Sequence, residues 1–375
     1  MSNKRAELAN VQRVVIKIGS SLLTDPVQGL AREKIADYSQ QIAELVKRGI
    51  QVVLVSSGAV AEGAARLGLS GRPEAVHELQ AAAAVGQIGL AHAYEEHLGA
   101  NGCITAMVLL THEDLADRQR YLNARATLHQ LMLGRVVPVI NENDTVATDE
   151  IRFGDNDTLA AMVANLIEAD LLIILSDVQG LLAEDPRVNP DAERISHASA
   201  NDRSLDQYPG SSVGQLGRGG MTTKISAARL AARSGAHTVI ANGSTAAVVN
   251  EVLAGQDIGT LLTADVTPMT ARKRWIANQL RAKGAVIVDA GAANALRAKG
   301  VSLLAVGVCA VSGQFSRGDV VVVRDEQGVE IAQGLVNYNA GEVERLKGAK
   351  TENFAQLIDY VGEPELIHRD NLVVL

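Results

Sequence analysis

The feature of this sequence that most limits its fold is a regular alternation of short β-branched runs with longer stretches of helical periodicity. The runs are nearly continuous in Val, Ile and Leu, which is typical of parallel strands covered on both faces. Strand, helix and strand in succession imply right-handed crossovers, so the first two-thirds of the chain predict an αβα sandwich with a mainly parallel sheet. The predicted strands are Arg13–Ile18, Gln51–Ser56, Cys103–Leu110, Val136–Ile140, Leu171–Ser176 and His237–Ala241, and the helical stretches lie near residues 31–48, 75–98, 118–133, 157–168 and 223–234.

The pattern changes after residue 262. Residues 263–280 show little periodicity and are predicted to be a linker, and a basic cluster lies within it and just beyond it (Arg272, Lys273, Arg274, Arg281 and Lys283). Short strands with Gly-rich turns follow, so residues 281–375 predict a small, mostly-β, barrel-like domain. Its predicted strands are Ala285–Val288, Val301–Val308, Asp319–Arg324, Glu330–Val336 and Leu372–Leu375.

Composition excludes several classes of protein. A hydrophobic content of 47% in 375 residues excludes a disordered chain, and a net charge of -8 argues against a nucleic-acid coat or a membrane-surface protein. Two cysteines cannot form a disulfide framework or a four-ligand zinc site. Because the N-terminus lacks a secretory pattern and no apolar run approaches about 20 residues, we expect a cytoplasmic protein.

Three glycine-bearing turns follow predicted strands or open predicted helices. Lys17 and Gly19 end the first strand, and Ser57 and Gly58 follow the second. Small residues let backbone amides approach phosphate or carboxylate oxygens, particularly where a helix begins. A surface lysine after an ordinary turn and a simple serine cap are the alternatives at these two turns.

The third turn, residues 217–224, combines three glycines, two threonines and Lys224 at a helix start. It matches neither a dinucleotide fingerprint nor a P-loop, because Thr222 stands where the dinucleotide motif has a glycine and Lys224 follows a threonine. A flexible linker is the alternative. We predict a nucleotide site of another type.

Polar residues gather in two loops at the same predicted sheet edge. Asn141–Asp144 follows the fourth strand and Gly154–Asp157 precedes an apolar helix, although a turn and a helix cap would explain each separately. These carboxylates could bind an ammonium group, orient lysines or hold magnesium through water. Ser176 and Asp177, at the end of the fifth strand, could contact ribose or adenine, or simply form a turn. Eight histidines without a nucleophile elbow or an HExxH motif make hydrolase and zinc-protease functions poor candidates.

In combination, these segments resemble the amino-acid kinase superfamily, and within it the glutamate 5-kinase family. The similarity extends to an arginine-rich stretch, Asp117–Arg125, and to residues 313–319, which resemble part of the PUA domain of bacterial members. The resemblance implies ATP-dependent phosphorylation of the γ-carboxylate of L-glutamate, the first step of proline biosynthesis. It also implies magnesium dependence, with ligands that the sequence does not identify, and feedback inhibition by proline. We expect a homo-oligomer with no membrane or RNA partner.

The resemblance also implies roles for individual residues. Lys17 and Lys224 correspond to phosphoryl-transfer lysines, and Asp157 corresponds to the acid that organises them. Ser57, Asp144 and Asn156 match glutamate-binding positions, and we expect Asp144 to face the α-ammonium group. The positions matching the ATP site are Lys17, Ser176, Asp177, Arg218, Gly219, Gly220, Met221, Thr222, Thr223 and Lys224.

Two alternatives remain open at this stage. One is another carboxylate kinase of the superfamily, acting on N-acetylglutamate or aspartate. An acetylated amine carries no charge and would not need Asp144, and aspartate kinases usually carry a different regulatory domain. The other is RNA binding through the PUA-like tail, but residues 281–375 hold 10 Lys and Arg against 12 Asp and Glu, and phosphate contacts dominate RNA affinity.

Overall fold

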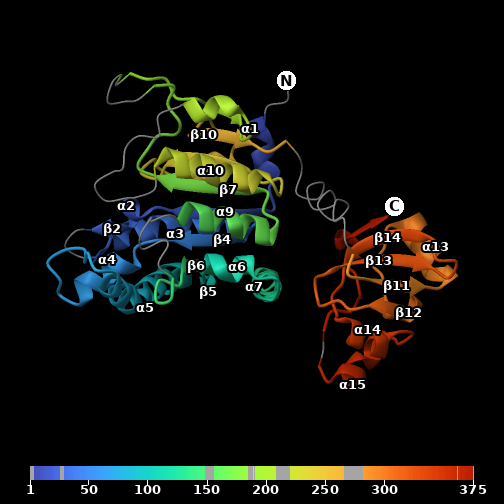
Figure 1. The fold of residues 1–375 in the computed structure, drawn as a ribbon. Coiled ribbons are helices and arrows are strands. Elements are labelled where there is room, and N and C mark those ends of the chain that lie inside the picture. Colours follow the sequence, from blue (N-terminus) through green and yellow to red (C-terminus); the bar gives the residue numbers. More distant parts are fainter. Residues whose placement is uncertain are drawn as a thin grey trace. The chain divides into compact units, whose positions relative to one another are not determined.

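The computed structural model describes residues 4–25, 29–147, 156–184, 189, 191–207, 220–265, 282–360 and 362–374. The chain forms two compact units, Met1–Pro268 and Met269–Leu375 (Figure 1). Several residues singled out in the sequence lie outside the described residues, namely Gly154, Asp155, Gly217, Arg218, Gly219, Arg272, Lys273, Arg274 and Arg281. The predicted linker also lies there, apart from its first three residues.

The first unit is built on an eight-stranded sheet with the order β5-β6-β4-β1-β7-β9-β10-β8. Neighbouring strands are parallel except β9 and β10, which pair antiparallel. The strands are β1 (Arg13–Ile18), β4 (Gln51–Ser56), β5 (Ile104–Leu110), β6 (Val136–Glu142), β7 (Leu171–Ser176), β8 (His197–Ser199), β9 (His237–Asn242) and β10 (Thr260–Thr263), beside a separate short pair, β2 (Thr24–Asp25) and β3 (Gly29–Leu30).

Helices cover both faces of this sheet (Figure 1). Side chains from α3, α5 and α11 form one hydrophobic core, and side chains from α7, α9 and α10 form the other. The helices of the unit are α1 (Lys4–Glu7), α2 (Ser20–Leu23), α3 (Arg32–Lys47), α4 (Ala59–Arg66), α5 (Val76–Ala100), α6 (His112–Ala116), α7 (Arg118–Leu133), α9 (Asn156–Ile167), α10 (Met221–Ala232) and α11 (Val248–Leu253), with 3-10 turns at Leu8–Asn10 and Arg203–Gln207.

The αβα sandwich predicted from the sequence is confirmed. β1, β4 and β7 have the predicted bounds, because continuous apolar runs mark strands buried on both faces. Two strands at the β8 edge of the sheet were not predicted, the antiparallel β10 and the three-residue β8. Thr263, expected in the linker, is the last residue of β10. No described helix has the length and apolar character needed to cross a membrane.

The second unit contains a five-stranded sheet with the order β12-β11-β13-β14-β15. Its strands are β11 (Gly284–Val288), β12 (Val308–Gly313), β13 (Val320–Asp325), β14 (Glu330–Leu335) and β15 (Leu372–Val374). Its helices are α13 (Ala290–Lys299), α14 (Ala340–Leu346) and α15 (Phe354–Ile358), with 3-10 turns at Ala305–Gly307, Thr351–Asn353 and Arg369–Asn371. The β-rich tail predicted from the sequence is confirmed, with more helix than expected.

The predicted strand Val301–Val308 is wrong. Only Leu303 makes an isolated bridge, to Ile367, and the strand begins where the prediction ends, at Val308. A Cβ on Gly307 would lie 2.5 Å from the side chain of Ala292, so the chain passes too close to α13 for an ordinary residue. Leu303 and Ala305 are buried in the core, the latter in a 3-10 turn, whereas Val301, Leu304 and Val306 are exposed, and composition alone does not separate this arrangement from a strand.

Candidate active site

Five neighbouring parallel strands, β6, β4, β1, β7 and β9, end at the same edge of the first sheet. In open α/β sheets, ligands bind outside the carboxyl ends of the strands. The loops that follow β6, β4, β1 and β7 carry most of the residues singled out in the sequence. This edge is therefore the place where a shared site can form.

Lys17 lies near the end of β1, and its side chain is directed by the alternation of the strand. Val15 belongs to the core beneath α9 and α10, whereas Ile16 and Ile18 belong to the opposite core. Since residues two apart share a face, Lys17 points to the side of α9. It is 6% exposed, which is unusual for a lysine without a specific partner.

The partner of Lys17 is Asp157, in the first turn of α9. Its carboxylate is fully buried, and its Oδ1 lies 2.6 Å from the Nζ of Lys17. Its Oδ2 lies 3.1 Å from the Nζ of Lys224, and the hydroxyl of Thr223 donates to the same oxygen at 3.3 Å. One carboxylate thus holds two lysines that are far apart in the sequence, as the resemblance implies.

Lys224 occupies a position that disfavours a cation. It lies in the first turn of α10, where the helix dipole is positive, and it is only 4% exposed. Asp157 compensates for this cost. A buried cation held against a helix N-terminus indicates a site for anionic oxygens rather than a device for stability.

The electrostatic balance of the cluster is positive. Burial alone raises the pKa of Asp157, but the ammonium groups of Lys17 and Lys224 outweigh burial and lower the pKa to about 2. Asp157 is therefore ionised at neutral pH, and the two lysines leave one positive charge in excess. Such a preorganised charge stabilises negative charge on a bound or transferring group.

A second group of contacts surrounds Asn156, the first residue of α9. Its Nδ2 lies 2.7 Å from the Oγ of Ser57, 3.0 Å from the carbonyl oxygen of Ser56 and 3.2 Å from the Oδ1 of Asn141. The buried Oδ1 of Asn156 has no hydrogen-bond partner among the described residues. A buried amide oxygen of this kind can accept a hydrogen bond from a ligand.

The turn after β4 brings Ser57 to this point. Gly58 has a φ of 109°, which side chains rarely adopt, and a Cβ there would lie 3.0 Å from Leu30. The turn leads into α4, which begins at Ala59. The hydroxyl of Ser56 is fixed by Tyr94 of α5 at 2.9 Å.

Asp144 lies beyond the end of β6, close to a second buried carboxylate. Burial and the neighbouring charge of Glu142 raise the pKa of Asp144 to about 7, and Arg72 acts in the opposite direction. The Nδ1 of His112 lies 3.5 Å from Glu142. A pair of carboxylates that repel each other in a buried site favours the arrival of a cation.

Ser176 and Asp177 end β7, next to β1. The hydroxyl of Ser176 donates to the carboxylate of Asp177 at 3.0 Å, and Asn242 at the end of β9 donates to the carbonyl of Asp177 at 3.3 Å. Gly220, Met221 and Thr222 stand at the start of α10, where helix amides lack intrahelical partners. Arg218 and Gly219 lie outside the described residues.

The structure brings Lys17, Asp157, Thr223 and Lys224 into one cluster, with Asn156 and Ser57 adjoining it. Tyr94 was missed by the sequence reasoning, and nothing in its helical surroundings distinguishes it from a core tyrosine. Asn141 was noticed only as part of a polar loop, whereas its side chain links Asn156 to Gln87 of α5, with 2.9 Å between its Nδ2 and the Oε1 of Gln87.

The described residues do not build a metal site of their own. No group of three or more metal-ligating side chains occurs among the described His, Cys, Asp and Glu residues. Both oxygens of Asp157 are engaged by lysines, so this carboxylate does not fit the role of a magnesium ligand. As far as the described residues go, a divalent ion fits this site only when the bound substrates supply most of its ligands.

Two sequence profiles match the chain. The profile of the amino acid kinase family matches residues 12–242, and the profile of the PUA domain matches residues 284–358. The first covers more than half of the chain and includes both lysines of the cluster, so this protein belongs to the amino acid kinase family.

Curated relatives show to which enzymes within the amino acid kinase family this chain is similar. A glutamate 5-kinase of Chromohalobacter salexigens is 56% identical over 374 residues, which span 100% of this chain and 99% of that protein. A glutamate 5-kinase of Pseudomonas paraeruginosa is 55% identical over 371 residues, which span 99% of this chain and 100% of that protein. The chain therefore belongs to the glutamate 5-kinases. A solved UMP kinase from Bacillus anthracis, with a TM-score of 0.47 and 17% identity over 68% of this chain and 97% of its own, is too distant to support a conclusion.

Proposed function

We propose that this protein transfers the γ-phosphoryl group of ATP to the γ-carboxylate of L-glutamate. The products are γ-glutamyl phosphate and ADP, and the reaction is the first step of proline biosynthesis. Full-length similarity to glutamate 5-kinases supports this reaction. The structural observation that carries it is the Lys17–Asp157–Lys224 bridge beside Asn156.

The chemistry needs no general base. The γ-carboxylate of glutamate is already an anionic nucleophile, so one of its oxygens forms a bond to the γ-phosphorus while the bond to the β,γ-bridging oxygen breaks. ADP leaves with that electron pair. The difficulty is to hold two anions together and to stabilise charge on the transferring group. Lys17 and Lys224 supply the opposing charge, and Asp157 fixes both ammonium groups in advance.

The glutamate end of the site is assigned to Ser57, Asn156 and Asp144. The acceptor left open on Asn156 and the paired carboxylates near Asp144 suit an α-ammonium group, which donates hydrogen bonds and carries positive charge. N-acetylglutamate offers no such charge and would leave a buried carboxylate uncompensated. This electrostatic demand favours a free amino acid over its acylated form.

The nucleotide end is assigned to Ser176, Asp177 and residues 218–224. The first turn of α10 offers backbone amides and the side chains of Thr223 and Lys224 to phosphate oxygens. If a divalent cation is required, for which we propose magnesium, the nucleotide phosphates would supply its ligands and it would neutralise part of their charge. The residue-level assignments in both halves of the site rest on this proposal.

Glutamate binding should weaken below about pH 7. In the free enzyme the pKa of Asp144 is raised to about 7, so acidification protonates this carboxylate and removes the counter-charge for the ammonium group. We expect kcat/KM for glutamate to fall by up to about tenfold per pH unit below that value. Initial rates from pH 5.5 to 8.5 at saturating ATP test this. In the control, Asp144→Asn, kcat/KM for glutamate should no longer fall between pH 7 and 5.5.

The reaction itself is tested by trapping its product. With ATP and hydroxylamine, the purified protein should convert glutamate to its γ-hydroxamate, while N-acetylglutamate and aspartate should give little product. Hydroxamate formation of similar size with N-acetylglutamate would transfer the proposal to the other carboxylate kinases. ADP release without any hydroxamate would reject acyl phosphate formation altogether.

Three further properties belong to the proposal: the family resemblance implies the first of them, and the other two are expectations from the sequence. Proline acts as a feedback inhibitor, the enzyme works as a homo-oligomer, and it acts in the cytoplasm. If proline acts on this enzyme, micromolar to millimolar additions should lower the rate at subsaturating glutamate. These properties are independent of the lysine cluster.

RNA binding by the second unit gains no support from its charges. Several of its basic side chains are paired with acids, namely Lys283 with Asp319, Arg297 with Asp325, Arg317 with Glu363 and Arg324 with Glu330. Phosphate binding would have to replace these pairs. We assign the unit a regulatory or assembly role instead.

A further inference from the structure

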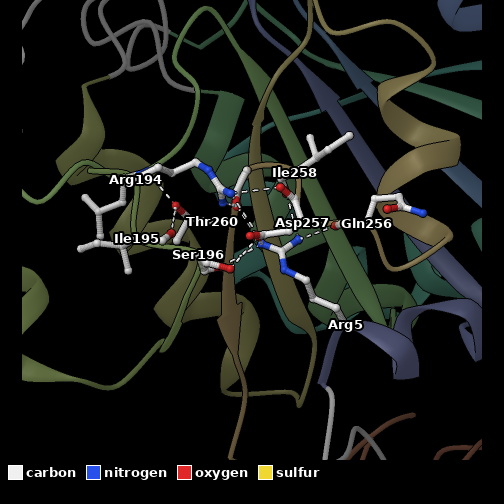
Figure 2. Close-up of polar contacts among 10 residues, drawn as sticks. Arg5, Arg194, Ile195, Ser196, Gln256, Asp257, Ile258 and Thr260 are labelled. Atoms are coloured by element: carbon white, nitrogen blue, oxygen red, sulfur yellow. Dashed lines mark hydrogen bonds and ion pairs between the residues drawn. The ribbon is translucent and has the colours of Figure 1, made fainter. Parts of the chain in front are cut away.

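A network of polar contacts surrounds the turn Gln256–Gly259, which joins α11 to β10. Figure 2 shows the guanidinium groups of Arg5 and Arg194 reaching this turn from two sides. The Nη1 of Arg5 donates to the carbonyl oxygens of Gln256 and Ile258, both at 2.9 Å. Its Nη2 donates to the carbonyl oxygens of Gly259 at 2.7 Å and Ser196 at 2.8 Å. One buried side chain therefore satisfies four carbonyl groups.

Asp257 is the acidic centre of the network. Its Oδ1 lies 3.0 Å from Arg5 and 3.1 Å from Arg194, and it accepts a hydrogen bond from the hydroxyl of Ser196 at 2.6 Å. These contacts, that of Ser196 first, hold the pKa of Asp257 below its ordinary value. Two cations and one anion thus fasten the turn to the N-terminal helix α1 and to the stretch before β8.

Thr260, which follows this turn as the first residue of β10, holds the chain that leaves β7. The hydroxyl of Thr260 accepts from the amide of Leu181 at 2.8 Å and donates to the carbonyl of Ile195 at 2.6 Å. The amide of Ile195 in turn donates to the carbonyl of Leu181 at 2.8 Å. Leu181 comes shortly after Ser176 and Asp177, so the network fixes the chain just beyond the proposed nucleotide contacts of β7.

A second connection leads from the network to α10. The stretch held by Arg5 and Arg194 continues into β8, and Arg229 of α10 donates to the carbonyl oxygens of Ala200 at 3.3 Å and Asp202 at 3.2 Å, just beyond β8. α10 carries Lys224 in its first turn. Both segments assigned to the nucleotide are therefore tied to one piece of chain, whose anchor is Arg5.

From these contacts we infer that Arg5 is a positioning residue for the nucleotide end of the active site, acting through the Gln256–Gly259 turn and through Thr260, which follows it. The inference rests on the proposed function in that it takes ATP as the ligand. Among the residues that the structure describes, the hydrogen bonds and ion pairs of Arg5 reach none that is assigned to substrate. Its effect should therefore fall on nucleotide affinity and spare the glutamate end, which is built on β4, β6 and α9.

The test compares Arg5→Ala with wild type in calorimetric titrations of the full-length protein with a non-hydrolysable ATP analogue. We expect Kd for the analogue to rise about tenfold, whereas KM for glutamate at saturating ATP changes by less than about twofold. Arg5→Lys should give an intermediate Kd, because a single ammonium group cannot span four carbonyl oxygens. All titrations are run well below the lowest unfolding midpoint of the set.

Arg13→Ala is the matched control. Arg13 is also an arginine near the N-terminus with a partly buried side chain, and it donates to the carbonyl of Ile167 at 2.7 Å and to the side chain of Gln51 at 2.9 Å. It is the first residue of β1, so it lies at the edge of the sheet opposite to the candidate active site. It should lose stability without losing nucleotide affinity. If Arg5→Ala does not fold, Arg5→Lys and Asp257→Asn serve in its place.

Three outcomes overturn the inference. The first is an unchanged Kd for the analogue in every folded variant of the network. The others are an equal rise of Kd for the analogue and KM for glutamate in Arg5→Ala, or a loss of nucleotide affinity in Arg13→Ala as large as that in Arg5→Ala. The reaction assigned to the protein fails separately, if wild type forms no γ-glutamyl hydroxamate. A raised Kd in Arg5→Ala together with hydroxamate formation by wild type supports both the role of Arg5 and the proposed reaction.

Discussion

Lys17→Ala and Lys224→Ala should each lower kcat by about 10²–10³, the usual loss for one preorganised donor to transition-state charge. Each variant removes one of the two ammonium groups that Asp157 holds at 2.6 and 3.1 Å. The remaining lysine then balances the carboxylate, and the excess positive charge of the cluster disappears. Steady-state rates of ADP release at saturating glutamate and ATP measure the loss, which should appear in kcat more than in KM for glutamate.

Lys34→Ala is a suitable control, because Lys34 is exposed on α3 and belongs to neither half of the site. It should keep kcat within about twofold of wild type. Thermal unfolding must show that the two active-site variants are folded at the assay temperature. A folded Lys17→Ala or Lys224→Ala enzyme with wild-type kcat contradicts the transfer role of that lysine.

Asp144→Asn should raise KM for glutamate by about 10–10², because a hydrogen bond to a charged group contributes about 1.5–3 kcal/mol. The amide keeps the size of the side chain but removes the negative charge that we assign to the α-ammonium group. KM for ATP should change little, since the nucleotide residues lie on β7 and α10. Paired determinations of both KM values at pH 8 separate the two effects.

The same substitution should stabilise the free protein at alkaline pH. The folded-state pKa of Asp144, about 7, is above the ordinary value of 3.8, so its ionisation opposes folding once the pH exceeds the unfolded value, and the full cost is present above about pH 7. Asp144→Asn removes this cost, so its gain in Tm should be larger at pH 8 than at pH 5. Asp37→Asn, an exposed control on α3, should show neither the KM change nor the gain. For the binding role, equal changes in KM for glutamate and KM for ATP in Asp144→Asn would count against a contact between Asp144 and the α-ammonium group.

The sheet of the first unit was predictable because its strands are buried on both faces. Such strands must be apolar along their whole length, so runs such as Gln51–Ser56 mark their own bounds. Edge elements lack this signal. β8 is three residues long, and β10 is fixed by Thr260 and by the arginine network rather than by its own composition. In the second unit, the apolar run Val301–Gly307 has the composition of a strand, although Leu303 and Ala305 are buried while Val301, Leu304 and Val306 are exposed.

Candidate residues for the site could be selected from the sequence, but their geometry could not. Turns at strand ends and the family resemblance selected Lys17, Asp157 and Lys224, yet only the fold shows that one carboxylate contacts both lysines. The strand alternation of β1 explains the direction of Lys17, but the distance to α9 depends on tertiary packing. Tyr94 and Arg5 were beyond sequence reasoning, because their partners lie far along the chain and are a single hydroxyl for Tyr94 and main-chain carbonyls with one carboxylate for Arg5.

The central claim is that an oxygen of the glutamate γ-carboxylate attacks the γ-phosphorus of ATP between Lys17 and Lys224. It is tested most directly with glutamate labelled with ¹⁸O in that carboxylate, incubated with ATP and hydroxylamine. Hydroxylamine attacks the acyl carbon, so the released phosphate should carry one ¹⁸O atom from glutamate, in step with hydroxamate formation. Mass spectrometry that finds only unlabelled phosphate, with ADP still formed, would show that ATP is hydrolysed without transfer to glutamate.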